Sequence, residues 1–218
     1  MQKITALRVQ KKNNNRVNVY LDGAFAFGLS RIVAAWLEVG QEIDKDKIKQ
    51  LVTDDAQEVA FQRAIKFISY RPRSMNEVRK NLEKHDTPED IIEQIIQRLI
   101  DDRLIDDTRF ANLWVENRTA FRPRGRRALE FELRQHGIDS TMIQQALSSI
   151  DEEELAIKAA QKKLHKYQDQ DFQKFREKMY RYLTQRGFCY EAINNAIGHV
   201  WNEQTYTASP YEEEEVDI

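Results

Sequence analysis

Residues 121–138 of the chain read FRPRGRRALEFELRQHGI, and this stretch decides the fold. Its Arg-Pro-Arg start does not fit inside a helix, because proline lacks an amide hydrogen and clashes with the preceding turn. Apolar side chains then recur at helical spacing until a glycine ends the stretch. Nearly the same pattern occurs about fifty residues earlier, at 70–86 (YRPRSMNEVRKNLEKHD). It occurs again more loosely, without the Arg-Pro-Arg start, about fifty residues later, at 172–188 (FQKFREKMYRYLTQRGF).

The three copies stay in register, which indicates an internal repeat. Five apolar columns and one turn column align: Leu82, Leu133 and Leu183; Ile92, Ile143 and Ile193; Ile95, Ala146 and Ala196; Ile96, Leu147 and Ile197; Leu99, Ile150 and Val200; and, in the turn, Asp86, Gly137 and Gly187. Three short helices cannot bury their apolar faces alone, so repeated units of this kind stack. The sequence predicts three tandem three-helix repeats, at 54–105, 106–150 and 151–204, that form an elongated, curved array with a long groove.

Residues 1–52 differ from the repeats and predict a small α+β module. Apolar and polar residues alternate at 4–9 and 17–21, and Asp22-Gly23 is a tight-turn signal before a short strand at 24–28. Two short helices are expected at 30–38 and 46–51, ahead of a first repeat helix at 54–69. The fold class is therefore mainly α with an N-terminal β-meander.

Helix-start signals place the next two helices of the first repeat. Ser74 with Glu77 three residues later predicts a capping box. Thr87 is expected as the next N-cap, with Pro88 at the first helical position. The second helix therefore begins after Ser74 and the third after Thr87.

Composition limits the class of protein. The chain has 218 residues, of which 41% are hydrophobic and 32% charged, and its only cysteine is Cys189. A single cysteine allows no disulfide within the chain, and no apolar run approaches the length of a membrane span. We expect a cytoplasmic protein without a membrane segment.

Charge is distributed unevenly along the chain. Residues 211–218 (YEEEEVDI) carry five carboxylates, so the rest has 34 basic against 31 acidic residues, a net formal charge of +3. Residues 205–218 are expected to be a disordered acidic tail. Such a tail either keeps the protein soluble or competes for the arginines of the repeats.

No pattern in the sequence predicts catalysis, a cofactor or a metal. The chain has no glycine-rich phosphate loop and no GxSxG, and its four histidines lack metal-ligand spacing. His85 and His136 fall near helix C-termini, where positive charge suits the helix dipole. Paired acids such as Asp101-Asp102 are typical of helix caps. We expect a protein that is not an enzyme.

Arginines around the two Arg-Pro-Arg segments are the candidate binding residues. Arginine presents a planar fork that suits phosphate or carboxylate, and no acid closer than Glu130 follows residues 122–127 in the sequence. Unless a partner neutralises them, such cations repel one another. The other interpretation is a solvated surface with internal ion pairs. Tyr70 and Phe121, just before these segments, are candidates for exposure. The candidate residues are Arg71, Arg73, Arg79, Lys80, Arg118, Arg122, Arg124, Arg126, Arg127 and Arg134.

Four segments give the chain a resemblance to the RecX regulators of the RecA recombinase. They are Tyr70-Arg-Pro-Arg-Ser74, residues 99–111 (LIDDRLIDDTRFA), residues 122–138, and residues 180–193, which contain Arg-Gly-Phe. Together they span about residues 54–200. His136 stands where the family usually has lysine, and Arg124-Gly125 stands where some members have Gly-Pro.

The resemblance implies a modulator, mainly negative, that lies in the groove of the RecA–DNA filament. It would restrain filament extension, ATP hydrolysis and strand exchange in DNA repair, recombination and the SOS response. The implied partners are the RecA nucleoprotein filament and single- or double-stranded DNA, and we expect a monomer. Two alternatives remain open on the residues alone: a free-standing helical DNA-binding protein, and a helical scaffold for another protein.

Overall fold

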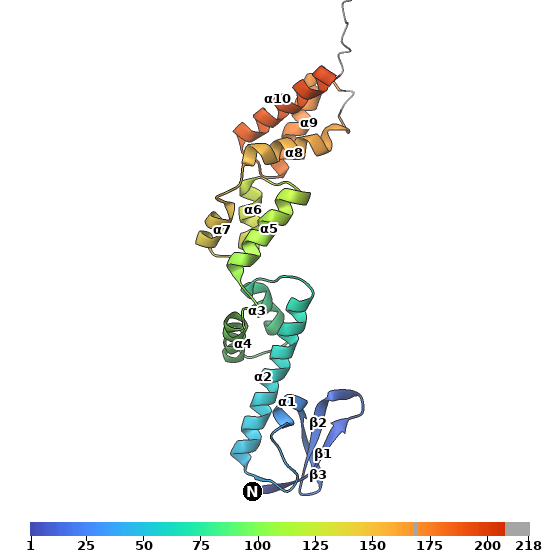
Figure 1. Ribbon diagram of the computed structural model, residues 1–218, viewed down its shortest axis with the longest axis vertical. Helices are drawn as coiled ribbons and strands as arrows, with labels where there is room; N and C mark the ends of the chain where they lie inside the picture. Colours follow the sequence, from blue (N-terminus) through green and yellow to red (C-terminus); the bar gives the residue numbers. More distant parts are fainter. Residues whose placement is uncertain (168–169, 208–218) are drawn as a thin grey trace, which may run out of the picture. The chain divides into compact units, whose positions relative to one another are not determined.

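The computed structural model describes residues 1–167 and 170–207, and the chain divides into two compact units, Met1–Ile105 and Asp106–Ile218. Each unit is built mainly of helices, with one sheet in the first (Figure 1). The tail expected from residue 205 begins inside the last helix, which runs to Thr207. Residues 208–218, which hold all the carboxylates of that tail, lie outside the described residues. None of the described helices is long and apolar enough to cross a membrane.

The first unit opens with a four-stranded antiparallel sheet in the order β3-β2-β1-β4. The expected tight turn is confirmed, since Asp22 and Gly23 both have positive φ, 49° and 89°. β2 begins earlier than the alternation indicated, directly after a turn at residues 11–12. Ile4, Val19 and Leu29 are fully buried in the small core beneath the sheet. The strands are β1 (Gln2–Gln10), β2 (Asn13–Leu21), β3 (Ala24–Ser30) and β4 (Glu42–Ile43).

A single long helix, α2 (Lys45–Ser69), replaces the two helices expected at 46–51 and 54–69. No glycine or proline interrupts residues 41–69, so the backbone has no reason to break. Asp55 anchors the middle of α2 to the sheet: it accepts from the Ser30 amide at 2.5 Å and from Arg16 Nη2 at 2.9 Å. The predicted border between residues 52 and 54 therefore lies inside a helix. The helix expected at 30–38 is shorter, with α1 covering Arg31–Ala34.

The first three-helix repeat consists of the C-terminal part of α2, α3 (Met75–Glu83) and α4 (Glu89–Asp101). The capping box of Ser74 and Glu77 is confirmed. The N-cap of α4 was expected at Thr87 but lies one residue later, at Pro88, and no side chain caps that end. Proline has a fixed φ near −65° and needs no amide partner, so it suits this position too.

The second unit contains the other two repeats, which share one hydrophobic core. A single carboxylate helps to join them: Glu152 Oε1 accepts from the Arg126 amide at 3.1 Å and from the Cys189 amide at 3.2 Å. One repeat consists of α5 (Asp107–Phe121), α6 (Arg126–Gln135) and α7 (Ser140–Leu147), and the next of α8 (Glu152–Leu164), α9 (Phe172–Gln185) and α10 (Tyr190–Thr207).

The repeat register predicted from the sequence is confirmed within all three repeats. Leu82, Leu133 and Leu183 are each fully buried in the middle helix of their repeat. The residues of the turn column all have positive φ, 55° at Asp86, 77° at Gly137 and 80° at Gly187. Each middle helix thus ends through a left-handed residue, which sends the chain back along the repeat.

Candidate functional site

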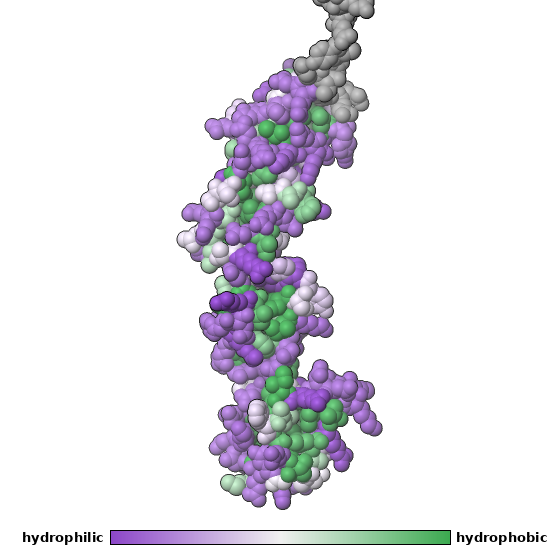
Figure 2. Space-filling view, viewed as in Figure 1, coloured by the Kyte–Doolittle hydropathy of each residue, from purple (hydrophilic) through white to green (hydrophobic). Residues whose placement is uncertain are grey.

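Each Arg-Pro-Arg segment forms a tight connection between two helices. Pro72 separates α2 from α3, and Pro123 separates α5 from α6. The aromatic residues that precede them are exposed as expected: Tyr70 is 73% and Phe121 71% accessible. Charged and polar side chains cover most of the visible surface in Figure 2, so the cations must be sorted by their partners rather than by exposure alone.

In the first repeat, three of the candidate arginines form ion pairs within the repeat. Arg71 lies 2.6 Å and Arg73 3.3 Å from the carboxylate of Glu77, the residue that completes the capping box. Arg73 also packs over the Phe67 ring at 4.0 Å and is only 17% exposed. Arg73 therefore stabilises the connection between α2 and α3, because it contacts a residue of each helix.

Arg79 links α3 to α4, whereas the neighbouring Lys80 is exposed. Arg79 binds Glu89 and Glu93, with Nη2 2.5 Å from the Glu93 carboxylate. The hydrogen bond that Arg79 donates to the Glu93 carboxylate raises the pKa of Arg79 above its usual value. Lys80 forms no ion pair with the rest of the described chain, so its charge stays available.

In the second repeat, Glu132 accepts two hydrogen bonds and forms a further ion pair with Arg124. It accepts from Trp114 Nε1 at 2.8 Å and from Arg118 Nε at 2.7 Å, and Arg124 Nε lies 2.9 Å from its other oxygen. The Arg124 contact has ion-pair distance but not hydrogen-bond direction. The Glu132 side chain is only 14% exposed, so its negative charge needs compensation within the protein. Arg118 and Arg124 provide most of it.

Arg126 has a structural role at the end of a neighbouring helix. Its guanidinium donates to the carbonyls of Leu147 at 2.7 Å and Ile150 at 2.6 Å, where α7 ends. Carbonyls at a helix C-terminus lack partners within the helix, so a cation there satisfies both hydrogen bonding and the dipole. Arg134 is more exposed, at 61%, and pairs with Glu130 at 2.5 Å.

The structure therefore divides the candidate residues. Arg118, Arg124 and Arg126 do not need an outside partner, because acids or carbonyls distant in the sequence lie beside them. Arg122 and Arg127 are exposed and form no ion pair anywhere in residues 1–167 and 170–207. With Lys80, they are the candidates whose charge no described residue compensates.

A basic pocket beside Pro123 contains cations that the sequence analysis missed. Its volume is about 270 Å³, and it is formed by the connection between α5 and α6 and by the C-terminal ends of α8 and α9. The pattern Lys162-Lys163 with Lys166 was a visible signal, but nothing in the sequence placed it beside Arg122. The basic side chains of the pocket are Arg122, Lys162, Lys163, His165, Lys166 and Arg186.

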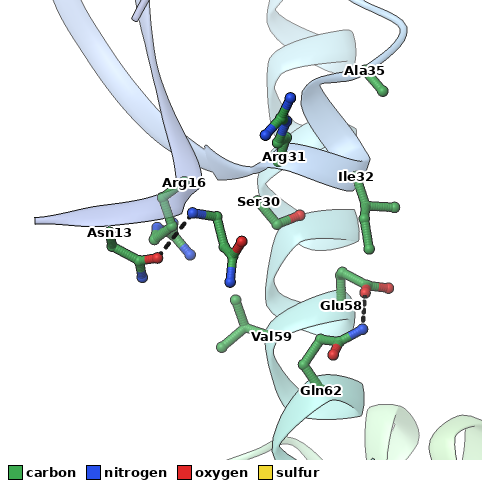
Figure 3. Close-up of a pocket in the computed structure, with 10 residues that line it drawn as sticks. Asn13, Arg16, Ser30, Arg31, Ile32, Ala35, Glu58, Val59 and Gln62 are labelled. Atoms are coloured by element: carbon green, nitrogen blue, oxygen red, sulfur yellow. Dashed lines mark hydrogen bonds between the residues drawn. The ribbon is translucent and has the colours of Figure 1, made fainter. Parts of the chain in front are cut away.

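A larger pocket, of about 780 Å³, lies in the first unit between the sheet and α2 (Figure 3). Glu58, Val59 and Gln62 of α2 face it, together with Ile32 of α1. Its polar groups are largely paired: Gln62 Nε2 donates to Glu58 Oε1 at 2.8 Å, and Arg16 binds Asp55. No candidate residue from the sequence lines this pocket. In the described parts of the chain, no group of three His, Cys, Asp or Glu residues is arranged to hold a metal ion.

Comparison with known proteins identifies the family. A regulatory protein RecX from Bacillus velezensis is 34% identical over 199 residues, which cover 89% of this chain and 76% of that protein. The chain belongs to the RecX family of regulatory proteins. A RecX protein from Clostridium botulinum (strain Eklund 17B) is 33% identical over 213 residues, which cover 94% of this chain and 100% of that protein.

Family models of RecX match four successive parts of the chain. The RecX N-terminal domain matches residues 2–44, and the first, second and third RecX three-helix domains match residues 60–99, 106–147 and 151–197. A crystal structure of a regulatory protein RecX superposes with a TM-score of 0.71 at 32% identity, covering 89% of this chain and 98% of that one. RecX from Lactobacillus salivarius superposes with a TM-score of 0.62 at 26% identity, covering 68% and 99%.

Proposed function

We propose that this protein is a non-enzymatic modulator of RecA, mainly a negative regulator. It binds in the groove of the RecA–DNA filament and restrains filament extension, ATP hydrolysis and strand exchange. The observation that carries the proposal is the match of all four RecX domains, in order, along one chain. The presence of all four domains supports the function that the resemblance to this family implies.

Uncompensated cations support a partner that carries negative charge. Arg122, the C-cap of α5, and Arg127, in the first turn of α6, are exposed and lack an ion pair among the residues described. A RecA–DNA filament offers phosphates and acidic side chains. The arginines that bind Glu77 and Glu132 instead support the repeat architecture and contribute less to the contact.

The test is an assay of RecA ATP hydrolysis and strand exchange on single-stranded DNA, with the protein titrated in. We expect both activities to fall as the protein approaches saturation of the filament. No effect at any ratio of protein to RecA would remove the proposal. A free-standing DNA-binding protein would instead bind bare DNA as tightly as the RecA–DNA filament, with a steep salt dependence.

The contact residues are tested by Arg122→Ala combined with Arg124→Ala and Arg127→Ala. Among the described residues, only Arg124 of these three forms an ion pair, and Arg118 keeps Glu132 paired after its loss, so the fold should persist. We expect weaker suppression of RecA. The matched control removes three exposed cations of the same unit: Lys158→Ala, Arg176→Ala and Arg181→Ala. Equal suppression by the folded triple variant and its control would contradict this choice of contact residues.

A further inference from the structure

The basic pocket beside Pro123 brings together cations from three places in the sequence. Arg122 lies at the end of α5, three lysines lie at the C-terminal end of α8, and Arg186 is the C-cap of α9. A hydrogen bond from the Gly125 amide to the Arg186 carbonyl, 3.0 Å long, holds two of these segments together. The pocket is therefore part of the joint between the second and third repeats.

No acidic side chain balances these cations in the described part of the chain. The residues that line the pocket include no aspartate and no glutamate. Arg122, Lys162, Lys163, Lys166 and Arg186 form no ion pair within residues 1–167 and 170–207. Five positive charges around a pocket of about 270 Å³ create a positive potential, which attracts anions and disfavours the empty pocket.

Neutral groups hold several of the cations in place without reducing their charge. Lys162 Nζ donates to the Phe121 carbonyl at 3.2 Å, and Arg186 Nη1 donates to the Pro123 carbonyl at 3.0 Å. The centre of the Tyr182 ring lies 4.6 Å from Arg186 Cζ and 5.2 Å from Lys163 Nζ. A cation on an aromatic face or a carbonyl is oriented but keeps its full charge.

This arrangement differs from that of the other arginines in the same unit. Arg118 and Arg124 share the carboxylate of Glu132, and Arg126 lies 4.0 Å from that of Glu152. Around Pro123, by contrast, cations without an ion pair among the described residues line one concave site. Carbonyl groups or the Tyr182 ring hold Lys162, Lys163 and Arg186 there, so a bound anion would need little rearrangement.

We propose that this pocket is a binding site for a phosphate group. Arginine and lysine are the side chains that bind phosphate best, arginine through its planar fork and lysine as a point charge. The volume is slightly below the range of about 300–1,000 Å³ typical of small-molecule pockets, which suits a phosphate rather than a large organic cofactor. The proposal does not require that the protein binds RecA, because it is argued from the charges of the pocket alone.

Two sources could supply the phosphate: the backbone of a nucleic-acid strand, or a free nucleotide or oligophosphate. The exposed Phe121 ring at the pocket favours a strand, because a base can stack on an accessible aromatic face while its phosphate enters the pocket. The experiment distinguishes the two sources with separate probes.

Binding is measured by fluorescence anisotropy of a labelled twenty-nucleotide oligo(dT) at several salt concentrations. The test variant is Arg122→Gln with Lys166→Gln, because neither side chain forms an ion pair with a described residue and the fold should be retained. The matched control is Arg176→Gln with Arg181→Gln, two exposed arginines of α9 that do not line the pocket. A second variant, Arg122→Lys with Lys166→Arg, keeps both charges.

We expect the test variant to bind oligo(dT) about tenfold more weakly, as two exposed charge contacts would give. The negative slope of log K against log salt should become less steep by about 1.4, since each lost phosphate contact on a single strand contributes about 0.7 to its magnitude. The control and the charge-preserving variant should stay within about twofold of the unchanged protein. Tripolyphosphate should displace the oligonucleotide from the unchanged protein. If tripolyphosphate binds in a pocket-dependent way and oligo(dT) does not, the site stands and its source is a free phosphate.

Three results would overturn the proposal. One is an equal loss of affinity in the test variant and the control, which would indicate only general attraction to a basic surface. Another is binding of both probes that the test variant leaves unchanged. The third is displacement of oligo(dT) by a polyglutamate peptide as effective as tripolyphosphate at equal charge, which would show that the pocket does not select phosphate.

Discussion

The backbone of Gly125 lies directly against the backbone of Gly187, where the second repeat meets the third. A Cβ atom on Gly125 would lie 2.2 Å from the Gly187 carbonyl oxygen, and one on Gly187 would lie 2.6 Å from Ala128 Cβ. Gly187 also has a φ of +80°, which side chains disfavour. This contact lets α6 begin beside the turn after α9, and it brings Pro123 to the basic pocket.

Gly125→Ala should destabilise the second unit. The added methyl group meets backbone atoms that cannot rotate away, so the overpacking should cost about 1–3 kcal/mol of unfolding free energy. Urea unfolding should be followed by tryptophan fluorescence in a Trp36→Phe background, where the remaining Trp114 and Trp201 both report on this unit.

Gly198→Ala is the matched control for that substitution. Gly198 lies inside α10 with open space around its missing Cβ. Alanine has the higher helix propensity, so this change should stabilise the unit by about 0.5–1 kcal/mol. A loss of stability of the same size in both variants would show that the Gly125 contact has no special role.

Glu152→Ala should be more damaging than its position on a helix surface implies. The carboxylate accepts from the amides of Arg126 and Cys189, and so caps the starts of α6 and α10 from a third helix. Two lost caps should reduce the unfolding free energy by about 2 kcal/mol. Glu154→Ala, two residues away and paired only with Lys158, should change it by about 0.5 kcal/mol at most. Similar urea midpoints for the two variants would refute this role.

Comparing Arg126→Ala with Arg127→Ala should distinguish an arginine that stabilises the fold from one that is only exposed on the surface. The first leaves the carbonyls of Leu147 and Ile150 without their donor and should cost about 1.5 kcal/mol, a low value because the side chain is 42% exposed and water can replace it. The second removes an exposed arginine and should stay within about 0.5 kcal/mol. Thermal unfolding of both variants tests the difference, and a greater loss in Arg127→Ala would reverse the assignment.

Acid should weaken the second unit through two helix caps. Hydrogen bonds from Thr141 lower the pKa of Asp139, and a hydrogen bond from the Lys174 amide lowers that of Asp171. Because the folded pKa values lie below the unfolded value of about 3.9, this stabilisation is present above about pH 4 and lost as the pH falls through the folded values.

Asp139→Asn with Asp171→Asn tests that dependence, since asparagine caps helices nearly as well but does not titrate. The double variant should match the unchanged protein in thermal midpoint at pH 7 and lose less of it between pH 5 and pH 3. Parallel pH profiles for the two proteins would exclude a contribution from these caps.

Local rules made the repeats predictable. Leu82, Leu133 and Leu183 had to be buried because they recur at helical spacing on one face of each middle helix. The turn column was equally visible in Gly137 and Gly187, since glycine after a helix signals a left-handed residue. The prediction was wrong at α2, where two helices were expected at 46–51 and 54–69. The absence of glycine and proline from residues 41–69 was a local signal of one continuous helix, whereas the contact of Asp55 with the sheet is a long-range interaction that no local pattern reports.

The mainly helical fold and the register of the three repeats follow from the sequence alone, and Tyr70 and Phe121 were rightly chosen there as candidates for exposure. The role of each arginine depends on contacts made in the folded chain. Arg124 and Arg126 look alike in the sequence, but one lies beside Glu132 and the other beside the end of α7. The basic pocket likewise joins Arg122 to Lys162 and Arg186, which follow it by 40 and 64 positions in the sequence. The physical reason is that helix formation depends on neighbours along the chain, whereas the compensation of a charge depends on neighbours in space.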